Sequence, residues 1–261
     1  MNYSFHNHTY LCHHATGTIE EYVVNAINNG IKYMGFSEHF PLKYKDLPQT
    51  EHRLLVEEID KYFDEVKRCK EKYKDKIDIL IGFEMEYYSD IFDQMYKDAV
   101  GYGADYLICG QHYTHCEYKY DTIQVSKPSS DIKHLKKYVS SVCEAIYKKV
   151  FTYIAHPDVL NFTGDKEIFK KEFSKICIAS NETNTPLEIN FLGIRQKRNY
   201  PNPNIWSLIG EYKCPVTFGF DSHSVKDSFD SESLKVAYEY VDKYKLNYIG
   251  KPDIINIQKK G

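Results

Sequence analysis

Six short apolar or β-prone runs in this chain end in side chains that can bind a metal ion. The first run holds two histidines two positions apart, and such residues in a strand point to the same face. The end residues of the six runs are His6 and His8, His39, Glu84, His112, His156, and Asp221 with His223. Such a regular recurrence predicts that the ends of several strands contribute to one metal site.

Strand-like runs alternate with amphipathic helical patterns along the whole chain. Most runs are continuous apolar stretches, which is typical of parallel strands buried on both faces. The expected strands cover residues 3–8, 33–39, 79–85, 106–112, 152–156, 186–191 and 216–220.

Helices are expected between the strands, because apolar residues recur there at helical spacing. The first begins with a capping box from Thr18 to Glu21 and is closed by Gly30. We interpret the many aromatic side chains of these patterns as helix–sheet packing. The other helical patterns cover residues 54–69, 90–100, 131–146, 165–176, 204–212 and 231–244.

Seven strand–helix units follow one another without a linker rich in Pro, Gly or Ser, so residues 1–261 are predicted to form a single α/β domain. A closed or nearly closed barrel is the first expectation, and an open doubly wound sheet is the alternative. In α/β barrels the chemistry lies at the C-terminal ends of the strands. The metal-capable residues occupy those ends, so the fold and the motifs point to the same site.

Composition disfavours several other classes of protein. The formal net charge of −3 argues against a nucleic-acid surface. No apolar stretch approaches the roughly 20 residues of a membrane span, and the N-terminus lacks a signal-peptide pattern. Seven cysteines without a C-x-x-C pair are typical of reduced thiols, and we interpret Cys12 and Cys116 as buried thiols rather than ligands. A cytoplasmic protein with a small-molecule partner is expected, and the oligomeric state stays open.

Nine candidate ligands are too many for one ion, because zinc normally takes four and a catalytic zinc keeps one position open. Two or three divalent ions are therefore expected, with Glu84 or Asp221 as a bridging carboxylate. Nitrogen and oxygen ligands suit Zn²⁺, Mn²⁺ or Fe²⁺ equally well. The nine candidates are His6, His8, His14, His39, Glu84, His112, His156, Asp221 and His223.

In motif order, this series resembles the PHP (polymerase and histidinol phosphatase) superfamily over nearly the whole chain. The motifs are His6-x-His8, His14-Ala15, Ser37-Glu38-His39, Gly82-Phe83-Glu84, Gly110-Gln111-His112, Ala155-His156-Pro157-Asp158 and Asp221-Ser222-His223. Within the superfamily the chain looks most like the stand-alone bacterial histidinol-phosphate phosphatases. It departs from the commoner forms in having Ser4 and Phe5 where an aspartate often precedes the first histidine pair, and Gly110-Gln111-His112 in place of G-S-V-H.

This resemblance implies a distorted TIM-like (β/α)7 barrel with a trinuclear metal site at the C-terminal ends of the strands. By the same resemblance, one ion would be held by His6, His8, Glu84 and Asp221. The second would be held by Glu84, His112 and His156, and the third by His14, His39 and His223. His13 is the alternative to His14, although the offset of eight residues from His6 favours His14.

The implied reaction is hydrolysis of L-histidinol phosphate, for which Glu84 and Asp221 are the expected catalytic carboxylates. A phosphate dianion needs a cationic clamp, and the bidentate geometry of arginine suits it. Arg195 is the first candidate, since the segment from Glu188 through Asn190 to Arg195 resembles the E-I-N-x-x-G-x-R stretch of these phosphatases. Further expected contacts with substrate are Asn190, Arg53 and His115, with Arg198 and Lys43 as weaker candidates. Asp158, Glu38 or His115 could protonate the leaving alkoxide.

Three rival interpretations stay open. Amidohydrolases also place a His-x-His pair on the first barrel strand, although the triad of His14, His39 and His223 favours phosphate chemistry. A PHP-type phosphatase or phosphodiesterase with another small substrate is the second rival. The third is a non-catalytic metal-binding barrel, which the complete ligand set argues against.

Overall fold

The computed structural model describes residues 1–42, 52–117 and 122–259. Lys43, one of the weaker candidates for the cationic clamp on phosphate, lies outside the described residues. Among the described residues, no helix combines the length and the apolar character that crossing a membrane requires.

All seven strands of the described chain pair in parallel, in two groups. The first group has the order β1 (Tyr3–Ser4), β2 (Tyr33–His39), β3 (Asp78–Met85) and β4 (Tyr106–Cys109). The second has the order β5 (Leu187–Asn190), β6 (Pro215–Gly219) and β7 (Asn247–Tyr248). This confirms the prediction of an α/β fold with parallel strands.

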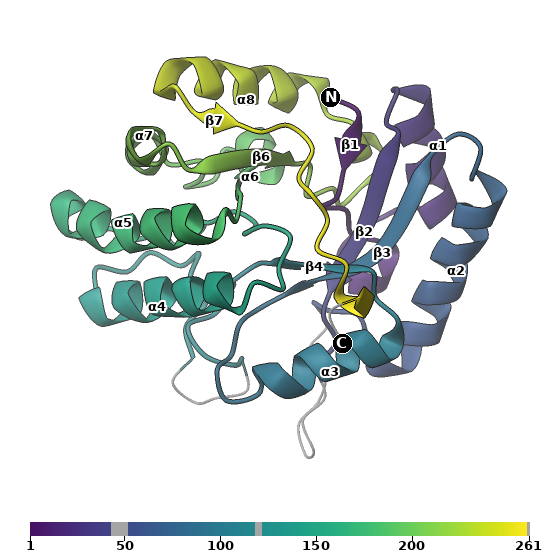
Figure 1. Cartoon of the computed structure of the whole chain (residues 1–261), viewed down its shortest axis with the longest axis horizontal. Coiled ribbons are helices and arrows are strands. Elements are labelled where there is room, and N and C mark those ends of the chain that lie inside the picture. Colours follow the sequence, from purple (N-terminus) through teal and green to yellow (C-terminus); the bar gives the residue numbers. More distant parts are fainter. Residues whose placement is uncertain (43–51, 118–121, 260–261) are drawn as a thin grey trace.

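Isolated bridges connect the two groups. Ile154 pairs in parallel with Cys109 on one side and with Leu187 on the other. Asn7 pairs in parallel with Ser222, so the chain just after β1 meets the chain just after β6. The sheet therefore curls, and Figure 1 shows its strands surrounded by the helices.

Six of the eight α-helices of the described chain begin after a side chain that accepts hydrogen bonds from the free backbone N–H groups of the first turn. Thr18 and Glu21 form the predicted capping box, and Asp131, Asp165 and Asp230 cap three other helices. The α-helices are α1 (Ile19–Asn28), α2 (Ile59–Lys72), α3 (Phe92–Tyr102), α4 (Ile132–Lys148), α5 (Lys166–Thr183), α6 (Phe191–Arg195), α7 (Pro203–Tyr212) and α8 (Ser231–Tyr244). Short 3-10 turns cover η1 (Tyr10–Cys12), η2 (Val56–Glu58), η3 (Val225–Ser228) and η4 (Ile257–Lys259).

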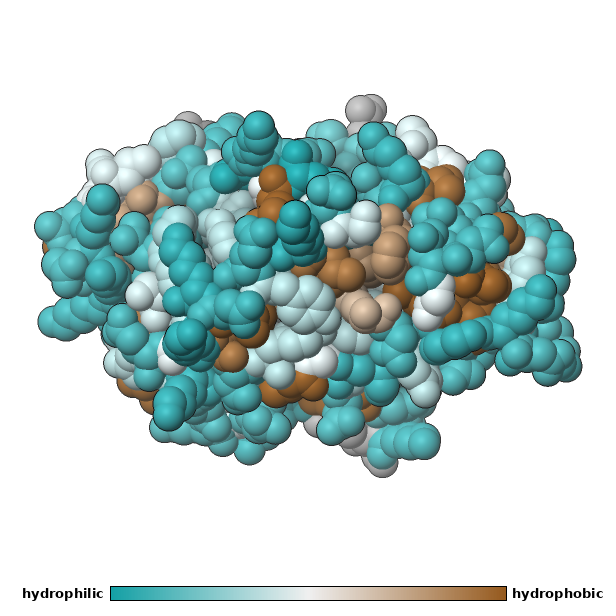
Figure 2. All heavy atoms as spheres, turned by 90° about the horizontal axis from the view of Figure 1, so that it is seen from above, coloured by the Kyte–Doolittle hydropathy of each residue, from teal (hydrophilic) through white to brown (hydrophobic). Residues whose placement is uncertain are grey.

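Two apolar cores follow from the alternation of side chains along the strands. In β4, Leu107 and Cys109 belong to the large core, whereas Tyr106 and Ile108 belong to a smaller one. The smaller core consists of Tyr3, Phe5, Tyr106, Ile108, Tyr153 and Ala155. On the face shown in Figure 2, hydrophilic side chains cover most of the surface and apolar ones are exposed only in separate areas.

Several predicted boundaries are wrong for local reasons. The first strand ends at Ser4, because the following residues turn into the site. Residues 152–156 contain a single bridge residue, Ile154, so they form no regular strand although their backbone also hydrogen-bonds to β4. α2 begins at Ile59 rather than near residue 54, and the chain enters helix α6 at Phe191, where strand was expected. β7 was not predicted.

Candidate metal centre

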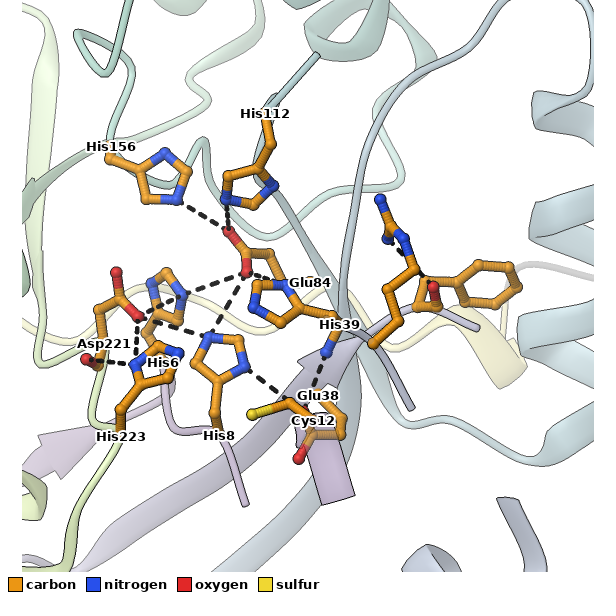
Figure 3. A network of polar contacts seen from close by, with 12 residues as sticks. His6, His8, Cys12, Glu38, His39, Glu84, His112, His156, Asp221 and His223 are labelled. Atoms are coloured by element: carbon orange, nitrogen blue, oxygen red, sulfur yellow. Dashed lines mark hydrogen bonds and ion pairs between the residues drawn. The ribbon is translucent and has the colours of Figure 1, made fainter. Parts of the chain in front are cut away.

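The structure brings all nine candidate ligands together at one end of the strands, and Figure 3 labels all of them except His14. Glu84, at the end of β3, lies at the centre of the cluster. Its Oε1 is 2.8 Å from His156 Nε2 and 3.5 Å from His112 Nε2. Its Oε2 is 2.9 Å from His39 Nδ1. This carboxylate therefore contacts residues that follow three different strand-like runs.

The first histidine pair lies between the two carboxylates of the cluster. His6 Nε2 is 3.7 Å from Glu84 Oε2 and 3.6 Å from Asp221 Oδ1. His8 Nε2 is 3.5 Å from Glu84 Oε2 and 3.4 Å from Asp221 Oδ1. Both imidazoles and Glu84 are almost completely buried. Both Nε2 atoms are thus held between two acidic oxygens and away from solvent.

His14 joins the cluster at its more exposed side. Its Nε2 lies 3.1 Å from His223 Nε2, a spacing at which two ring nitrogens can share one cation. His13 instead points to Glu58, with 3.0 Å between His13 Nε2 and Glu58 Oε2. The ring geometry therefore favours His14 over His13 as the candidate ligand. Cys12 is also close, and burial raises the pKa of its thiol well above the ordinary value.

The unpaired atoms of the cluster fit a metal ion. In the described structure His6 Nε2, His8 Nε2 and Glu84 Oε2 are buried without a hydrogen-bond partner. Such atoms are costly in a folded protein unless a cation or another partner satisfies them. Five subsets of three residues have their ligand atoms within 4.8 Å of one another, including His6, His8 and Asp221. Imidazole nitrogens and carboxylate oxygens at this spacing suit zinc and similar divalent ions.

The charges of the cluster also favour a cation. Burial alone would raise the pKa values of Glu84 and Asp221, but the nearby imidazoles outweigh it and hold both pKa values well below normal. Burial and the adjacent His8 lower the pKa of His39, and that of His223 falls to about 3. Ionised carboxylates thus lie beside His39 and His223, which are neutral near pH 7, whereas the same carboxylates raise the pKa values of His6 and His8, that of His8 to about 9.

Two members of the cluster have left-handed backbone conformations, with φ of 30° at His156 and 47° at Asp221. Residues other than glycine adopt such angles at a cost, and they do so mainly where surrounding contacts enforce them. At Asp221 those contacts include Arg195, which donates hydrogen bonds to the carbonyl oxygens of Phe220 and Asp221 at 2.7 and 2.5 Å.

A cavity of about 400 Å³ opens onto the cluster. Its floor includes Glu84, Asp221 and several of the histidines. Polar side chains dominate the remaining wall, together with Val125, Val159 and Leu192. Other residues that line the cavity are His52, Arg53, Glu86, Tyr113, Glu117, Gln124, Ser126, Gln196, Arg198 and Tyr200.

The sequence pattern of the PHP domain matches residues 4–191. The chain belongs to the PHP family. The resemblance inferred from the histidine motifs is therefore confirmed. The matched span ends before Asp221 and His223, which the fold brings back to the residues of the first half.

Named relatives of this PHP chain match it over more than four fifths of its length. A probable histidinol-phosphatase of Schizosaccharomyces pombe is 26% identical over 255 residues, covering 85% of this chain and 81% of the relative. The histidinol-phosphatase of Bacillus subtilis is 23% identical over 256 residues, covering 85% and 93%.

A solved structure of similar fold comes from Lactococcus lactis, a histidinol phosphate phosphatase complexed with zinc, L-histidinol and phosphate. Its TM-score is 0.69, with 19% identity and coverage of 95% of both chains. At this identity the likeness shows the fold shared by the two proteins.

Arg195 of this PHP chain differs from the expected phosphate clamp. Besides its two bonds to backbone carbonyls, its guanidinium lies 3.5 Å from Asp227 and 3.6 Å from Asp230. It does not line the cavity described above. These contacts direct it to the backbone that carries Asp221, so its role as the phosphate clamp stays a prediction. Sequence reasoning placed Arg195 near the site but could not give the direction of its side chain.

Two other expected active-site residues also have structural partners. Asp158 Oδ2 accepts hydrogen bonds from Trp206 Nε1 at 2.9 Å and from the Asn202 backbone at 2.5 Å, which ties α7 to the chain after His156. Asn190 donates to Asp221 Oδ2 at 3.0 Å, so its amide orients a candidate ligand. Neither side chain lines the cavity, and the expectation that they touch substrate or transfer a proton stays a prediction.

Of the remaining residues expected to contact substrate, some line the cavity and one does not. His115 does not line the cavity. Arg53 does, but its guanidinium is paired with two carboxylates, at 2.8 Å from Glu86 Oε1 and 2.7 Å from Glu117 Oε1. Among the described residues, no ion pair to a carboxylate involves Arg198, which also lines the cavity.

Sequence reasoning missed some residues of this region. His52 is exposed, but its ring also packs edge-on against His14, with the centroids 5.7 Å apart, and it lines the cavity. Nothing in its polar surroundings indicated this. Glu86 was also missed, although the signal was present: it follows Glu84 by two positions, the same spacing as His6 and His8.

Proposed function

We propose that this chain hydrolyses phosphomonoesters with the help of two or three bound divalent ions, and that its substrate is L-histidinol phosphate. The observation that carries the proposal is the convergence of seven histidines and two carboxylates in one cluster, with buried unpaired Nε2 atoms on His6 and His8 and with the other seven residues lining one cavity. Relatives named as histidinol-phosphatases match it over four fifths or more of both chains.

The ligand sets of this proposal follow the resemblance described above. His6, His8, Glu84 and Asp221 would hold one ion. Glu84, His112 and His156 would hold the second, and His14, His39 and His223 the third. The proximity groups support the membership of all nine residues, and Glu84 belongs to two of those groups, as a bridging ligand should. We further infer a distorted (β/α)7 barrel, supported by the bridges that continue the pairing from β4 to β5 and from Asn7 to Ser222.

Bound divalent cations would neutralise the charge of a phosphate dianion and lower the pKa of a bound water from about 15.7 toward about 7. The residues of this chain would supply the rest. The carboxylates of Glu84 and Asp221 balance the positive charge and fix the spacing of the ligands. Asn190 donates a hydrogen bond to the Asp221 carboxylate, and Arg195 donates one to the Asp221 backbone carbonyl.

Arg198 replaces Arg195 in this proposal as the residue that binds the non-bridging oxygens of the phosphate. Its guanidinium lines the cavity and donates only to neutral oxygens, at 3.0 Å from Gln196 Oε1 and 3.2 Å from the Tyr200 hydroxyl. An arginine held in this way keeps its charge available to an anion, whereas that of Arg53 is already balanced.

The alternative functions share the metal site and differ in substrate or in turnover. Another small phosphoester would use the same cations, and a non-catalytic barrel would bind metal without hydrolysis. The proposed biosynthetic role would place the protein in the cytoplasm.

The decisive assay is release of phosphate from L-histidinol phosphate, compared with a panel of sugar, nucleotide and amino-alcohol monoesters, with and without a chelator. Preferred hydrolysis of histidinol phosphate that disappears on chelation is expected. Equal rates across the panel would favour a broad phosphatase, and no hydrolysis with metal bound would refute the enzymatic proposal.

A further inference from the structure

Three buried glutamates lie behind the cluster, on the side of the histidine rings that faces away from its centre. Glu188 Oε1 is 2.8 Å from His6 Nδ1, and Glu86 Oε1 is 3.0 Å from His112 Nδ1. The side chains of Glu188, Glu86 and Glu38 are at most 2% exposed. None of the three belongs to the nine candidate ligands.

Glu38 takes the same position behind His8, at the end of β2. Its Oε2 lies 3.5 Å from His8 Nδ1, which has no hydrogen-bond partner among the described residues. Figure 3 shows Glu38 on the far side of the His8 ring from Glu84. Three histidines of the cluster therefore share one arrangement, with a carboxylate near Nδ1 and the Nε2 atom directed at Glu84 or Asp221.

This arrangement matters because a neutral imidazole carries its proton on only one nitrogen. A carboxylate that accepts a hydrogen bond from Nδ1 keeps the proton there and leaves the Nε2 lone pair free for a metal. It also fixes the rotation of the ring. His39 is the contrasting case, because its Nδ1 is the atom that faces Glu84, at 2.9 Å.

The other hydrogen bonds to Glu188 and Glu86 come from N–H groups, which can donate but not accept. Glu188 Oε2 accepts from the His156 backbone N–H at 3.0 Å and from Asn190 Nδ2 at 2.9 Å. Glu86 accepts from both terminal nitrogens of Arg53, at 2.8 and 3.0 Å. A glutamine at either position would direct its own N–H₂ group at a donor or leave a donor unsatisfied, so the sites require an ionised carboxylate.

Glycines make room for these side chains. A Cβ atom at Gly219, on β6, would overlap Glu188 Oε1. In the same way, a Cβ atom at Gly110 would overlap the candidate ligand Glu84. The neighbouring strand thus leaves space for Glu188 just as it does for a residue of the cluster itself.

We propose that Glu38, Glu86 and Glu188 are positioning residues that hold His8, His112 and His6 with Nε2 directed into the metal cluster. The inference rests on the metal-binding part of the proposed function. These glutamates would strengthen metal binding at the site and would not contact the substrate.

The first test measures zinc affinity by competition with a chelating indicator in wild type and in the variants Glu188→Gln and Glu86→Gln. Each variant should bind zinc about 10- to 100-fold more weakly. Glu172→Gln is the matched control, because Glu172 is also buried but pairs with Lys175 on α5. Its zinc affinity should equal that of wild type.

The second test needs no variant. Nitrogen-15 NMR of the histidine rings in zinc-loaded wild type should show His6, His8 and His112 protonated on Nδ1 and His39 protonated on Nε2. The opposite assignment for the first three would overturn the inference, as would unchanged zinc affinity in folded Glu188→Gln and Glu86→Gln. Wild type that binds no zinc would instead refute the proposed function.

Discussion

His39 and Glu84 face each other across two neighbouring strands, with His39 Nδ1 2.9 Å from Glu84 Oε2. They are register partners in the parallel pairing of β2 with β3. A histidine and a carboxylate that end adjacent parallel strands are brought together by the strand pairing alone, without help from loops. This pair therefore forms a rigid part of the site, around which the other ligands are arranged.

Glu84→Gln should remove more metal than the loss of a single ligand would suggest. Glu84 contacts five histidines, and both of its oxygens are used. Elemental analysis of the purified variant should show a loss of more than one metal equivalent relative to wild type, together with loss of phosphatase activity. Full metal content and normal turnover would show that Glu84 does not bridge ions.

Gly110→Ala should have a similar effect without changing any ligand. The added methyl group would collide with the Glu84 carboxylate and displace it from His156 and His112. We expect reduced metal content and activity in a folded protein. Gly101→Ala is the matched control, since a Cβ atom at Gly101 meets nothing within 4 Å. If Gly110→Ala kept its full metal content, the tight packing around Glu84 would not be essential.

Arg198→Ala and Arg195→Ala should produce different defects. Loss of Arg198 removes a charge-assisted hydrogen bond worth about 1.5–3 kcal/mol, so kcat/KM should fall on the order of 10- to 100-fold with metal content unchanged. Arg195→Ala should lower metal content, because Arg195 holds the backbone of Asp221. Steady-state kinetics at saturating metal, paired with elemental analysis, separates the two. The reverse pattern would restore Arg195 as the clamp.

Chelation should destabilise the protein. Metal removal leaves His6 Nε2 and His8 Nε2 buried without a hydrogen-bond partner. An ion present at 100 times its dissociation constant contributes about 2.7 kcal/mol to stability, which corresponds to a fall in Tm of roughly 5–10 °C on removal. Differential scanning calorimetry with and without chelator measures the shift, and restored Tm on adding zinc is the control. An unchanged Tm would argue against tightly bound ions.

Glu86 should contribute a pH-dependent part of the stability. Burial opposes its charge, but Arg53 outweighs this effect and lowers the pKa of Glu86 from the ordinary 4.5 to about 2. Because the folded-state pKa is depressed, this stabilisation is present above pH 4.5 and is lost as the pH falls toward 2.

Urea unfolding of chelator-treated wild type and Glu86→Gln at pH 5 and pH 3 tests this dependence. The difference in free energy of unfolding should shrink at the lower pH, within a total on the order of 3 kcal/mol. A difference that stays constant with pH would mean that the Glu86 carboxylate does not stabilise the fold through its charge.

Much of the candidate site could be predicted from the sequence, because its signals are local. Spacing by two positions identified His6 and His8, and the ends of apolar runs identified residues such as Glu84 and His156. Parallel strands carry their C-terminal ends to one edge of a sheet, so residues at those ends gather wherever the intervening helices pack. The parallel α/β fold followed from the same alternation.

Only the tertiary structure decided which side chains support the ligands. His6 and Glu188 are 182 positions apart, yet their side chains are hydrogen-bonded. Arg195 and Arg198 are three positions apart in one segment, but only Arg198 reaches the cavity. The direction of a long side chain and the tautomer of a histidine depend on contacts from distant strands. Local sequence patterns therefore determined the types of ligand and their place in the fold, whereas long-range packing determined their partners.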